Sequence, residues 1–502
     1  MAAAAAALLV LCVSGGWAQA ASVSSPTFNS IKVEHSGLLP GKQVDAALPI
    51  RAGDEYDAAK AALARESLLS LFHNNGFLEA VVASRIALQN GAADLSLQVV
   101  EGPLYRFGET RFAGLKRIRE KDARRELPYG PGEAYVRSAL FAAQSRLYGL
   151  GLFEDIGVRV TTTTGKTAEV VVRVKEKRAK WVKAGVGWGS EESERASVQF
   201  RHANFLRQAY TLNLTAIYSR IWLEYNGEFV NRYFLGSKVE NRLQVSWRRE
   251  DLRGYDIEKS AGQTSFGRTL AYGIRGSLAY KLQRSVLFNF NPGITAPANT
   301  TDLTSSVALL ANRDTTDDPF FPTRGTLVQG RIERAGGVLG GDVHFNRASL
   351  DGAWYRGLWK KLTLAASART GAIRQFGPAS EVPVYERFFT GGANTIRGYR
   401  ERGVGRVDDL GAPVGGNVLL GANIELRFPI FWRFWGAAFL DGGQVDPREG
   451  LVVPAHWKYG TGAGLRVRTP VGPLRLDWGY KLSRQNADDS DWRIHLSLGE
   501  AF

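Results

Sequence analysis

The chain has 502 residues, enough for two or three domains, and its 64 Lys and Arg against 49 Asp and Glu give a formal net charge of +15. Its single cysteine, Cys12, lies in an apolar N-terminal stretch, so disulfides, thiolate metal sites and cysteine nucleophiles are excluded from the rest of the chain. The sequence holds no Gly-x-Ser-x-Gly elbow and no metal-spaced histidine pair, so we expect no enzymatic activity, no metal and no cofactor.

The N-terminus has the pattern of a secretory signal peptide, predicted over residues 1–20. The apolar run from residue 2 to residue 13 is too short to span a bilayer, and Ala18-Gln19-Ala20 is a small-x-small cleavage site. The usual basic start is missing, because no Lys or Arg precedes Lys32. Export argues against nucleic acid as a partner, so the basic residues are expected to line a lumen or to meet anionic lipid and lipopolysaccharide.

The segment after the signal peptide mixes helical and strand patterns. Residues 56–72 place apolar side chains on one helical face, and residues 95–100 have the pattern of a strand. The same order recurs with a helical pattern at 134–148 and a strand at 170–174. We therefore predict two small α+β modules, residues 21–104 and 105–179.

The segment from residue 180 to residue 502 has the pattern of a membrane β-barrel. From residue 492 to residue 498 apolar side chains occupy the even positions, and Arg493, His495 and Ser497 occupy the odd ones. Residues 474–482 repeat this alternation. At roughly 20 residues per tilted strand and turn, the segment predicts about sixteen antiparallel strands and a mainly β protein. A soluble sandwich would also alternate, but export and the basic polar face favour a barrel.

Three motifs in this segment identify a family. They are Ile396-Arg397-Gly398-Tyr399, then Phe439-Leu440-Asp441-Gly442-Gly443, and Asp314 followed by Phe321-Pro322-Thr323-Arg324-Gly325. Together they resemble motifs of the superfamily of outer-membrane protein assembly and secretion barrels. Its members carry periplasmic POTRA modules before a sixteen-stranded barrel. The phrase from Arg387 to Tyr399 is most similar to the outer-membrane subunit of the translocation and assembly module, which typically has three POTRA modules rather than two.

The resemblance implies a specific arrangement inside the barrel. A long sixth extracellular loop, about residues 386–418, would fold into the lumen and place the guanidinium of Arg397 against the carboxylate of Asp441. A planar, permanently charged guanidinium can be held bidentately by one carboxylate, which fixes the loop. We expect Gly398 to permit the sharp turn of the tip, and Gly442 and Gly443 to leave room for it.

The resemblance also implies a function that needs no nucleotide. Client outer-membrane proteins and autotransporters would be captured by the POTRA strands through β-augmentation and would then meet a weak seam between the first and last barrel strands. Residues 182–188 and 495–502 would form this seam. His495 lies in the last strand, Gly499 would permit a kink, and Phe502 resembles an assembly signal. An inner-membrane-anchored partner subunit is implied as well.

Other functions remain open at this stage. A two-partner secretion transporter also has two POTRA modules and an Arg-Gly-Tyr loop, and it would export one dedicated exoprotein through the lumen. The stretch from residue 21 to residue 30 is short for the plug helix and linker of such a transporter. The barrel-assembly core subunit usually carries five modules, which this chain cannot hold. A plain porin or a barrel-linked enzyme would be a different class of protein.

Overall fold

The computed structural model describes residues 26–89, 91–163, 165–290, 301–377, 381–446, 456–469, 472–483 and 490–498. The predicted signal peptide therefore lies outside the described residues. The chain divides into two compact units after Lys177. Among the helices of the described segments, none has both the length and the apolarity needed to cross a membrane.

The first unit begins with a three-stranded sheet packed on two helices. Its elements are β1 (Thr27–Glu34), α1 (Gly41–Ala47), α2 (Ala58–Asn74), β2 (Val81–Gln89) and β3 (Ala92–Val100). The sheet order is β1-β3-β2, with β1 parallel to β3. Asp57 caps α2 by accepting a hydrogen bond from the Ala59 amide. Phe28, Leu68, Phe72 and Leu97 are fully buried where the sheet meets α2.

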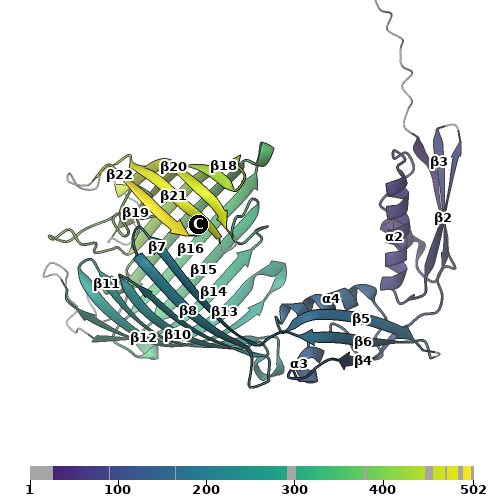
Figure 1. Ribbon diagram of the computed structural model, residues 1–502, viewed down its shortest axis with the longest axis horizontal. Helices are drawn as coiled ribbons and strands as arrows, with labels where there is room; N and C mark the ends of the chain where they lie inside the picture. Colours follow the sequence, from purple (N-terminus) through teal and green to yellow (C-terminus); the bar gives the residue numbers. More distant parts are fainter. Residues whose placement is uncertain are drawn as a thin grey trace, which may run out of the picture. The chain divides into compact units, whose positions relative to one another are not determined.

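A second module repeats this order. It contains β4 (Arg106–Ala113), α3 (Glu120–Arg124), α4 (Arg137–Gly149), β5 (Phe153–Thr162) and β6 (Thr167–Glu176), with the sheet order β4-β6-β5 and β4 parallel to β6. In both modules the third strand in sequence is central and the other two form the edges (Figure 1). Edge strands leave backbone N–H and C=O groups open to a further strand.

Glu176 ends β6 and organises the segment that leads into α3. Its carboxylate accepts hydrogen bonds from the amides of Lys116, Arg117 and Ile118 at 2.8, 2.9 and 3.0 Å. Partial burial would raise the pKa of Glu176, but these three amide donors hold it below its ordinary value. The carboxylate is therefore ionised at neutral pH and ties the segment to the end of the sheet.

The substitution Glu176→Ala is expected to raise the hydrogen-exchange rates of these three amides about fivefold, because a cap of this kind contributes about 1 kcal/mol. The wild-type protection should persist above the ordinary glutamate pKa and disappear as the pH falls through the lowered pKa of the folded state. Glu154→Ala on neighbouring β5 is the control, because Glu154 makes an exposed ion pair with Lys175. Equal exchange in both variants would contradict the prediction.

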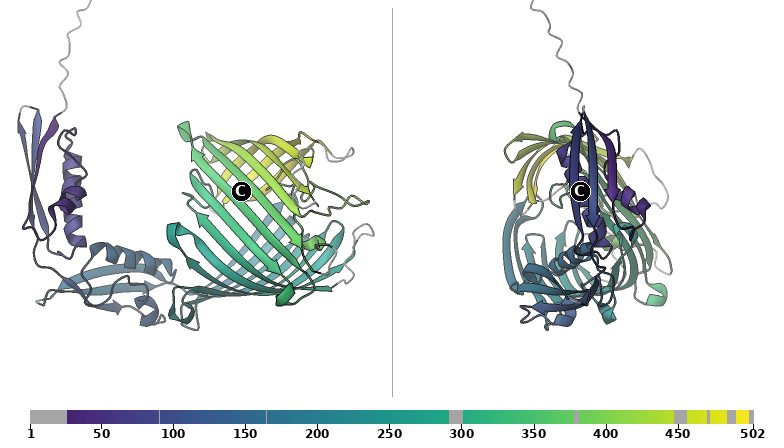
Figure 2. Two further views of the ribbon diagram at one scale, coloured as in Figure 1. Left: turned by 180° about the vertical axis from the view of Figure 1, so that it is seen from behind. Right: turned by 90° about the vertical axis from the view of Figure 1, so that its right-hand side faces the viewer.

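The second unit is a barrel wall of sixteen antiparallel strands, each paired with its sequence neighbours (Figure 2). The strands are β7 (Lys180–Gly189), β8 (Ser193–Phe205), β9 (Tyr210–Ser219), β10 (Trp222–Asn231), β11 (Glu240–Leu252), β12 (Tyr255–Thr269), β13 (Arg275–Phe288), β14 (Thr301–Asp314), β15 (Gly325–Ala335), β16 (Phe345–Gly357), β17 (Thr363–Gln375), β18 (Val418–Phe431), β19 (Phe434–Asp446), β20 (Lys458–Thr469), β21 (Gly472–Lys481) and β22 (Trp492–Leu498). Five 3₁₀ turns lie in the described connections: η1 (Phe234–Gly236), η2 (Ala271–Gly273), η3 (Gly337–Leu339), η4 (Trp359–Lys361) and η5 (Val384–Glu386). The predicted fold class and strand number are confirmed.

Alternating side chains give the wall two different faces. On β10, Tyr225 is exposed on the outer face, whereas Glu228 points inward and pairs with Arg242 of β11 at 2.5 Å. Outward residues pair across strands with outward residues, as in Tyr225 with Trp247 and Leu309 with Ile332. The outer face is therefore apolar and the lumen is charged, as lipid on one side and water on the other require.

Among the described residues, the sheet does not close with a continuous ladder. Where β22 meets the β7–β8 hairpin, the Ser190 amide donates to the Leu496 carbonyl at 3.3 Å, and the Leu496 amide donates to Ser190 Oγ at 3.3 Å. In this register Glu191 lies opposite His495, with Oε1 and Nδ1 3.7 Å apart. No ladder between β22 and β7 is formed by the described residues, and β7 is exposed on both faces from Lys180 to Trp188.

Candidate functional site: the loop tip inside the barrel

The connection from β17 to β18, residues 376–417, folds back on itself. Its described part forms isolated bridges between Phe388 and Gly416 and between Thr390 and Val404. Gly398 at the tip has φ +95°, a conformation that side-chain-bearing residues rarely adopt. Arg397 is 1% exposed and Tyr399 is fully buried, although both belong to a loop. A charged loop residue at this depth needs partners on the wall.

Asp441 of β19 is the main partner of Arg397. The two carboxylate oxygens receive Nε at 2.7 Å and Nη2 at 2.8 Å, and the backbone amide of Arg397 donates to the same carboxylate at 3.0 Å. The guanidinium lies 3.4 Å from the ring centroid of Phe439, two residues away on the same face of β19. Burial alone would lower the pKa of Arg397, but Asp441 and Glu425 keep it above its ordinary value. The loop tip is therefore fixed by one bidentate, fully charged contact.

A wider charge network surrounds this pair. Glu425 of β18 accepts from Arg397 Nη1 at 2.5 Å, from Arg466 of β20 at 3.1 Å and from Arg427 at 2.8 Å. Asp477 of β21 accepts from Arg466. The network thus joins the loop to four consecutive strands of the wall. Its most buried members, each at most 1% exposed, are Arg397, Arg427, Arg466, Arg475, Glu425, Asp441 and Asp477.

Neutral side chains complete the contact between loop and wall. Asn423 of β18 donates to Asp441 at 2.9 Å and to the Thr395 carbonyl of the loop. Asn394 of the loop accepts from Arg475 at 2.5 Å. Loop residues thus supply a countercharge or a hydrogen bond to several residues of the network. The network is therefore complete only while the loop tip is in place.

Glycines on the facing strands make this approach possible. A Cβ on Gly460 of β20 would collide with the Arg397 carbonyl oxygen, and a Cβ on Gly479 of β21 would lie 2.8 Å from the Arg397 carbonyl carbon. A Cβ on Gly443 would lie 3.2 Å from the side chain of Ile396 in the loop. The expectation for Gly442 is wrong, because its virtual Cβ meets Tyr459 and Trp457 instead of the loop. Gly460 and Gly479 are the positions that leave room for the tip.

The last strand also contacts the tip. The Gly398 amide donates to Nε2 of His495 on β22 at 3.1 Å, so this nitrogen is the acceptor and the proton is on Nδ1, the side that faces Glu191. Tyr399 donates to the Ser483 carbonyl in the segment that precedes β22. His495, on the last strand, thus contacts both the loop tip and the first hairpin. Gly499 and Phe502, also predicted at the seam, lie outside the described residues.

The predicted turn motif lies elsewhere, between β14 and β15. Asp317 accepts hydrogen bonds from the Thr323 amide at 2.8 Å and the Arg324 amide at 3.1 Å, whereas Asp314 caps its own neighbour Thr316. Gly325 has φ +108°. The whole motif is Phe321, Pro322, Thr323, Arg324 and Gly325. The structure does not bring it to Arg397.

The aromatic residue of this turn packs on the opposite end of the same wall. Phe321 is buried against Trp435 of β19, with ring centroids 5.0 Å apart, and the guanidinium of Arg468 stacks on it at 3.7 Å. The turn therefore packs against β19 and β20 at the opposite end of the wall from the β17–β18 connection. Sequence analysis did not single out Asp317, whose carboxylate accepts a hydrogen bond from an amide six residues later.

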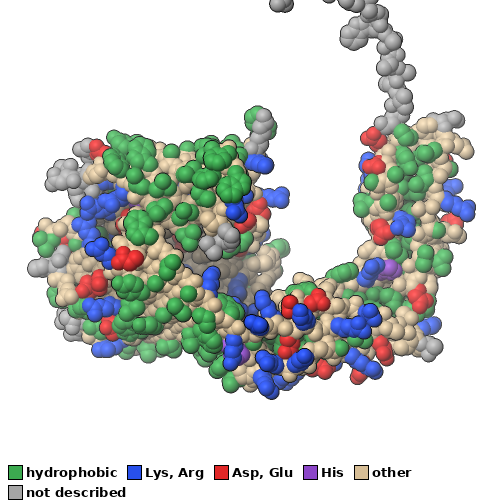
Figure 3. Space-filling model, viewed as in Figure 1, with side chains coloured by type: hydrophobic (Ala, Val, Ile, Leu, Met, Phe, Trp, Pro, Cys, Tyr) green, Lys and Arg blue, Asp and Glu red, His purple; other side chains and the backbone are tan. Residues whose placement is uncertain are grey.

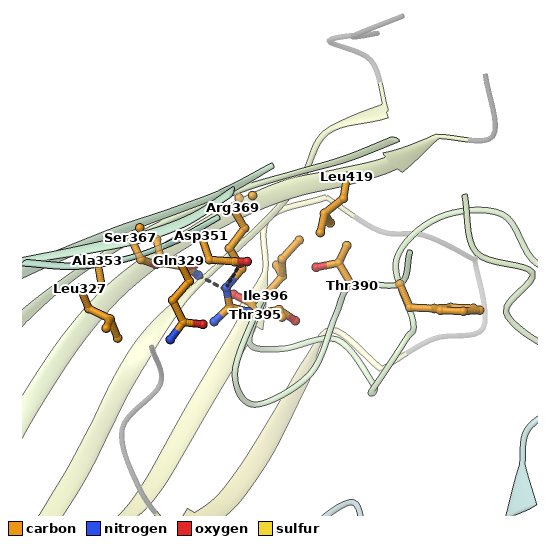
Figure 4. A pocket seen from close by; sticks show the side chains of 15 residues that line it. Leu327, Gln329, Asp351, Ala353, Ser367, Arg369, Thr390, Thr395, Ile396 and Leu419 are labelled. Carbon is orange, nitrogen blue, oxygen red and sulfur yellow. Dashed lines mark hydrogen bonds and ion pairs between the residues drawn. The ribbon is translucent and has the colours of Figure 1, made fainter. Parts of the chain in front are cut away.

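A cavity of about 450 Å³ lies beside the loop tip in the lumen. Figure 4 shows Gln329, Asp351 and Arg369 of the wall facing Thr395 and Ile396 of the loop. Arg369 and Asp351 form an ion pair at 3.8 Å. The described residues contain no cluster of three His, Cys, Asp or Glu able to hold a metal ion. This arrangement positions a loop through charge.

Comparison with known families decides the identity of the fold. Residues 204–502 match the Omp85 superfamily domain, and residues 26–102 and 105–177 each match the POTRA model, described as a surface antigen variable number repeat. The chain belongs to the Omp85 superfamily. It is a barrel of the Gram-negative outer membrane with POTRA domains in the periplasm. Because β7 begins on the POTRA side, the connection from β17 to β18 is the sixth extracellular loop of this Omp85 barrel.

Curated relatives of this Omp85 protein include two outer membrane protein assembly factors named BamA. The one from Nitratidesulfovibrio vulgaris is 24% identical over 78% of this chain and 50% of its own length. The one from Neorickettsia risticii is 25% identical over 91% of this chain and 63% of its own length. This chain therefore spans between half and two thirds of the length of these relatives.

Solved structures share the fold. BamA from Haemophilus ducreyi lacking POTRA domains 1–3 superimposes with a TM-score of 0.77 at 18% identity, covering 93% of this chain and 98% of the other. CdiB from Acinetobacter baumannii gives a TM-score of 0.53 at 13% identity, covering 94% of this chain and 89% of the other. At these identities the likeness concerns the fold alone.

Proposed function

We propose that this Omp85 barrel inserts or secretes other β-barrel proteins and autotransporters at the outer membrane, using the seam between β7 and β22 as a lateral opening. The observation that carries the proposal is the incomplete ladder at this seam. Among described residues the two strands are linked around Ser190 and Leu496, while both faces of β7 remain exposed. A strand with open backbone groups can pair with a strand of a client.

The POTRA modules support the capture of clients. In the first module β2 is an edge strand, and its Val81, Ile86 and Leu88 are exposed large apolar side chains. A client segment adding to this edge would gain backbone hydrogen bonds without a sequence requirement. The names of the BamA relatives, which describe outer membrane protein assembly, favour the same class of client.

Within this proposal, the role closest to the motifs is that of the outer-membrane subunit of a translocation and assembly module. The sixth-loop phrase from Arg387 to Tyr399 supports this assignment, and it implies an inner-membrane-anchored partner subunit. Lipid and lipopolysaccharide would surround the apolar outer face of the wall. The chemistry of the lumen supplies positioning by charge, so no nucleotide or cofactor enters the proposed cycle.

A reversible tether across the seam tests the opening. The double variant Ser190→Cys and Leu496→Cys places one thiol on each side of the seam at its point of contact, where Ser190 Oγ accepts from the Leu496 amide at 3.3 Å. Surface display of an autotransporter is expected to fall at least tenfold when the disulfide forms and to recover with reductant. Tenfold corresponds to about 1.4 kcal/mol. The remaining cysteine of the sequence, Cys12, belongs to the predicted signal peptide.

A tether inside the continuous wall is the matched control. Val198→Cys with Ala216→Cys joins two directly paired residues of β8 and β9, away from the seam. This disulfide should leave display unchanged, as should each single cysteine variant. Full display with a fully formed seam tether would reject lateral insertion and favour export of a dedicated exoprotein through the lumen.

A further inference from the structure

The outer face of the barrel carries a groove that the proposed function does not use. Its volume is about 830 Å³, and it crosses the lipid side of β8 to β14. Figure 3 shows apolar side chains gathered over this part of the wall, with charged side chains toward the extracellular edge. Most of the outer face projects apolar side chains into lipid, so a hollow of this size needs a local cause.

Small residues form the floor of the groove. Gly227 of β10 and Gly262 of β12 flank Val245 of β11 in one row of paired residues, and Ala216 of β9 and Ser260 of β12 line the neighbouring row. A Cβ on Gly262 would meet no atom within 4 Å, so open space lies directly above this position. The floor is therefore low at the two glycines, where no side chain projects, on either side of Val245.

Aromatic and branched side chains form the walls. Tyr225 and Trp247 pack together on one side with ring centroids 5.8 Å apart, and Leu282 of β13 borders the other side. Trp247 donates its indole N–H to Glu258 at 2.9 Å, which holds the ring in place. The groove thus has rigid apolar sides and an open apolar floor, a shape that suits a methylene chain.

One end of the groove carries a cation. Arg284 faces outward on β13, four residues before the extracellular end of that strand at Phe288, and it is exposed. Within the described ranges no acidic residue forms an ion pair with Arg284. An arginine on the lipid face is costly unless its long side chain reaches the headgroup region and meets an anion there.

We propose that this groove binds a lipid of the outer leaflet, with an acyl chain lying over Gly262 and Gly227 and a headgroup phosphate against Arg284. The arrangement combines two separate recognition elements. The hollow floor selects a chain by shape, and the unpaired guanidinium selects an anionic headgroup by charge. The bound lipid would be a specific component of the wall around β8 to β14, in contrast to the exchanging lipids elsewhere on the outer face.

Photocrosslinking tests this site in the full-length protein. The protein is reconstituted into phosphatidylcholine nanodiscs that contain a small fraction of phosphatidylglycerol with a diazirine in its acyl chain. Crosslinks in the wild type are expected to concentrate on peptides of β10, β12 and β13. Gly262→Phe fills the groove and should reduce these crosslinks about fivefold. Arg284→Gln should reduce them to a similar degree, since one cation near the membrane surface is worth about that factor.

Two controls separate a site from general lipid contact. Gly330→Phe adds the same ring to the outer face of β15, away from the groove, and should leave the crosslinks unchanged. A diazirine phosphatidylcholine of equal chain length should label wild type and Arg284→Gln equally weakly. The proposal is overturned if Gly262→Phe labels like wild type, or if the two lipids label the wild-type groove to the same extent. Heat-modifiable migration of every variant confirms that the barrel has folded.

Discussion

Replacing Arg397 by alanine is expected to destabilise the barrel by about 3–5 kcal/mol, because the change leaves buried carboxylates without their countercharge. Asp441 would lose a bidentate partner, and Glu425 would lose a contact of 2.5 Å. Both carboxylates are fully buried. The thermal midpoint of the heat-modifiable band should fall, and the amides of the loop tip should exchange hydrogen at rates typical of a free loop.

The loop itself offers a matched control. Arg406 is an exposed arginine of the same loop, so Arg406→Ala removes the same charge without burying an unpaired group and should leave both measurements unchanged. Arg397→Lys keeps the charge but cannot bind Asp441 bidentately, and it should fall between alanine and wild type. A double-mutant cycle with Asp441→Asn isolates the pair. Additive effects of the two substitutions would contradict the direct contact.

The barrel was the part of the fold most open to prediction. Alternation along residues 474–482 and 492–498 follows from the opposite demands of lipid and lumen, so a single chain displays it without any knowledge of its neighbours. The two helices at residues 58–74 and 137–149 follow from their apolar faces. The strands β1 and β4 were harder to predict, because each pairs in parallel with a strand sixty or more residues away.

The residues of the site also differ in how far the sequence alone predicts them. Arg397 and Asp441 lie in motifs with an unusual composition, and the resemblance named both. Glu425 carries no such signal, because it is one inward polar residue on an alternating strand, and the sequence around Arg466 and Asp477 does not show which residues these two side chains meet. Their convergence depends on the register of β18 to β21, which pairs Asn423 with Asp441 and Gly464 with Asp477. Their inward-facing positions on alternating strands could have predicted them as a group, but only the strand register shows which of them meet.

The substitution Gly479→Ala is expected to unseat the loop tip while leaving every charge of the network in place. The added methyl group would lie 2.8 Å from the Arg397 carbonyl carbon and 2.9 Å from Gly398 Cα, and both are backbone atoms that cannot rotate away. Overpacking of this kind costs about 1–3 kcal/mol. The expected result is faster hydrogen exchange at residues 396–399 and a lower thermal midpoint, although no charged side chain has been removed.

Gly352→Ala distinguishes this effect from the general cost of replacing glycine in a barrel strand. Gly352 lies on β16, where a Cβ meets no atom within 4 Å, so its substitution should leave the loop tip protected. If Gly479→Ala unseats the tip as fully as Arg397→Ala, steric fit and charge pairing are both required for one seated state. If Gly479→Ala leaves the tip protected, the wall yields around the loop, and the charge network alone determines where the tip lies.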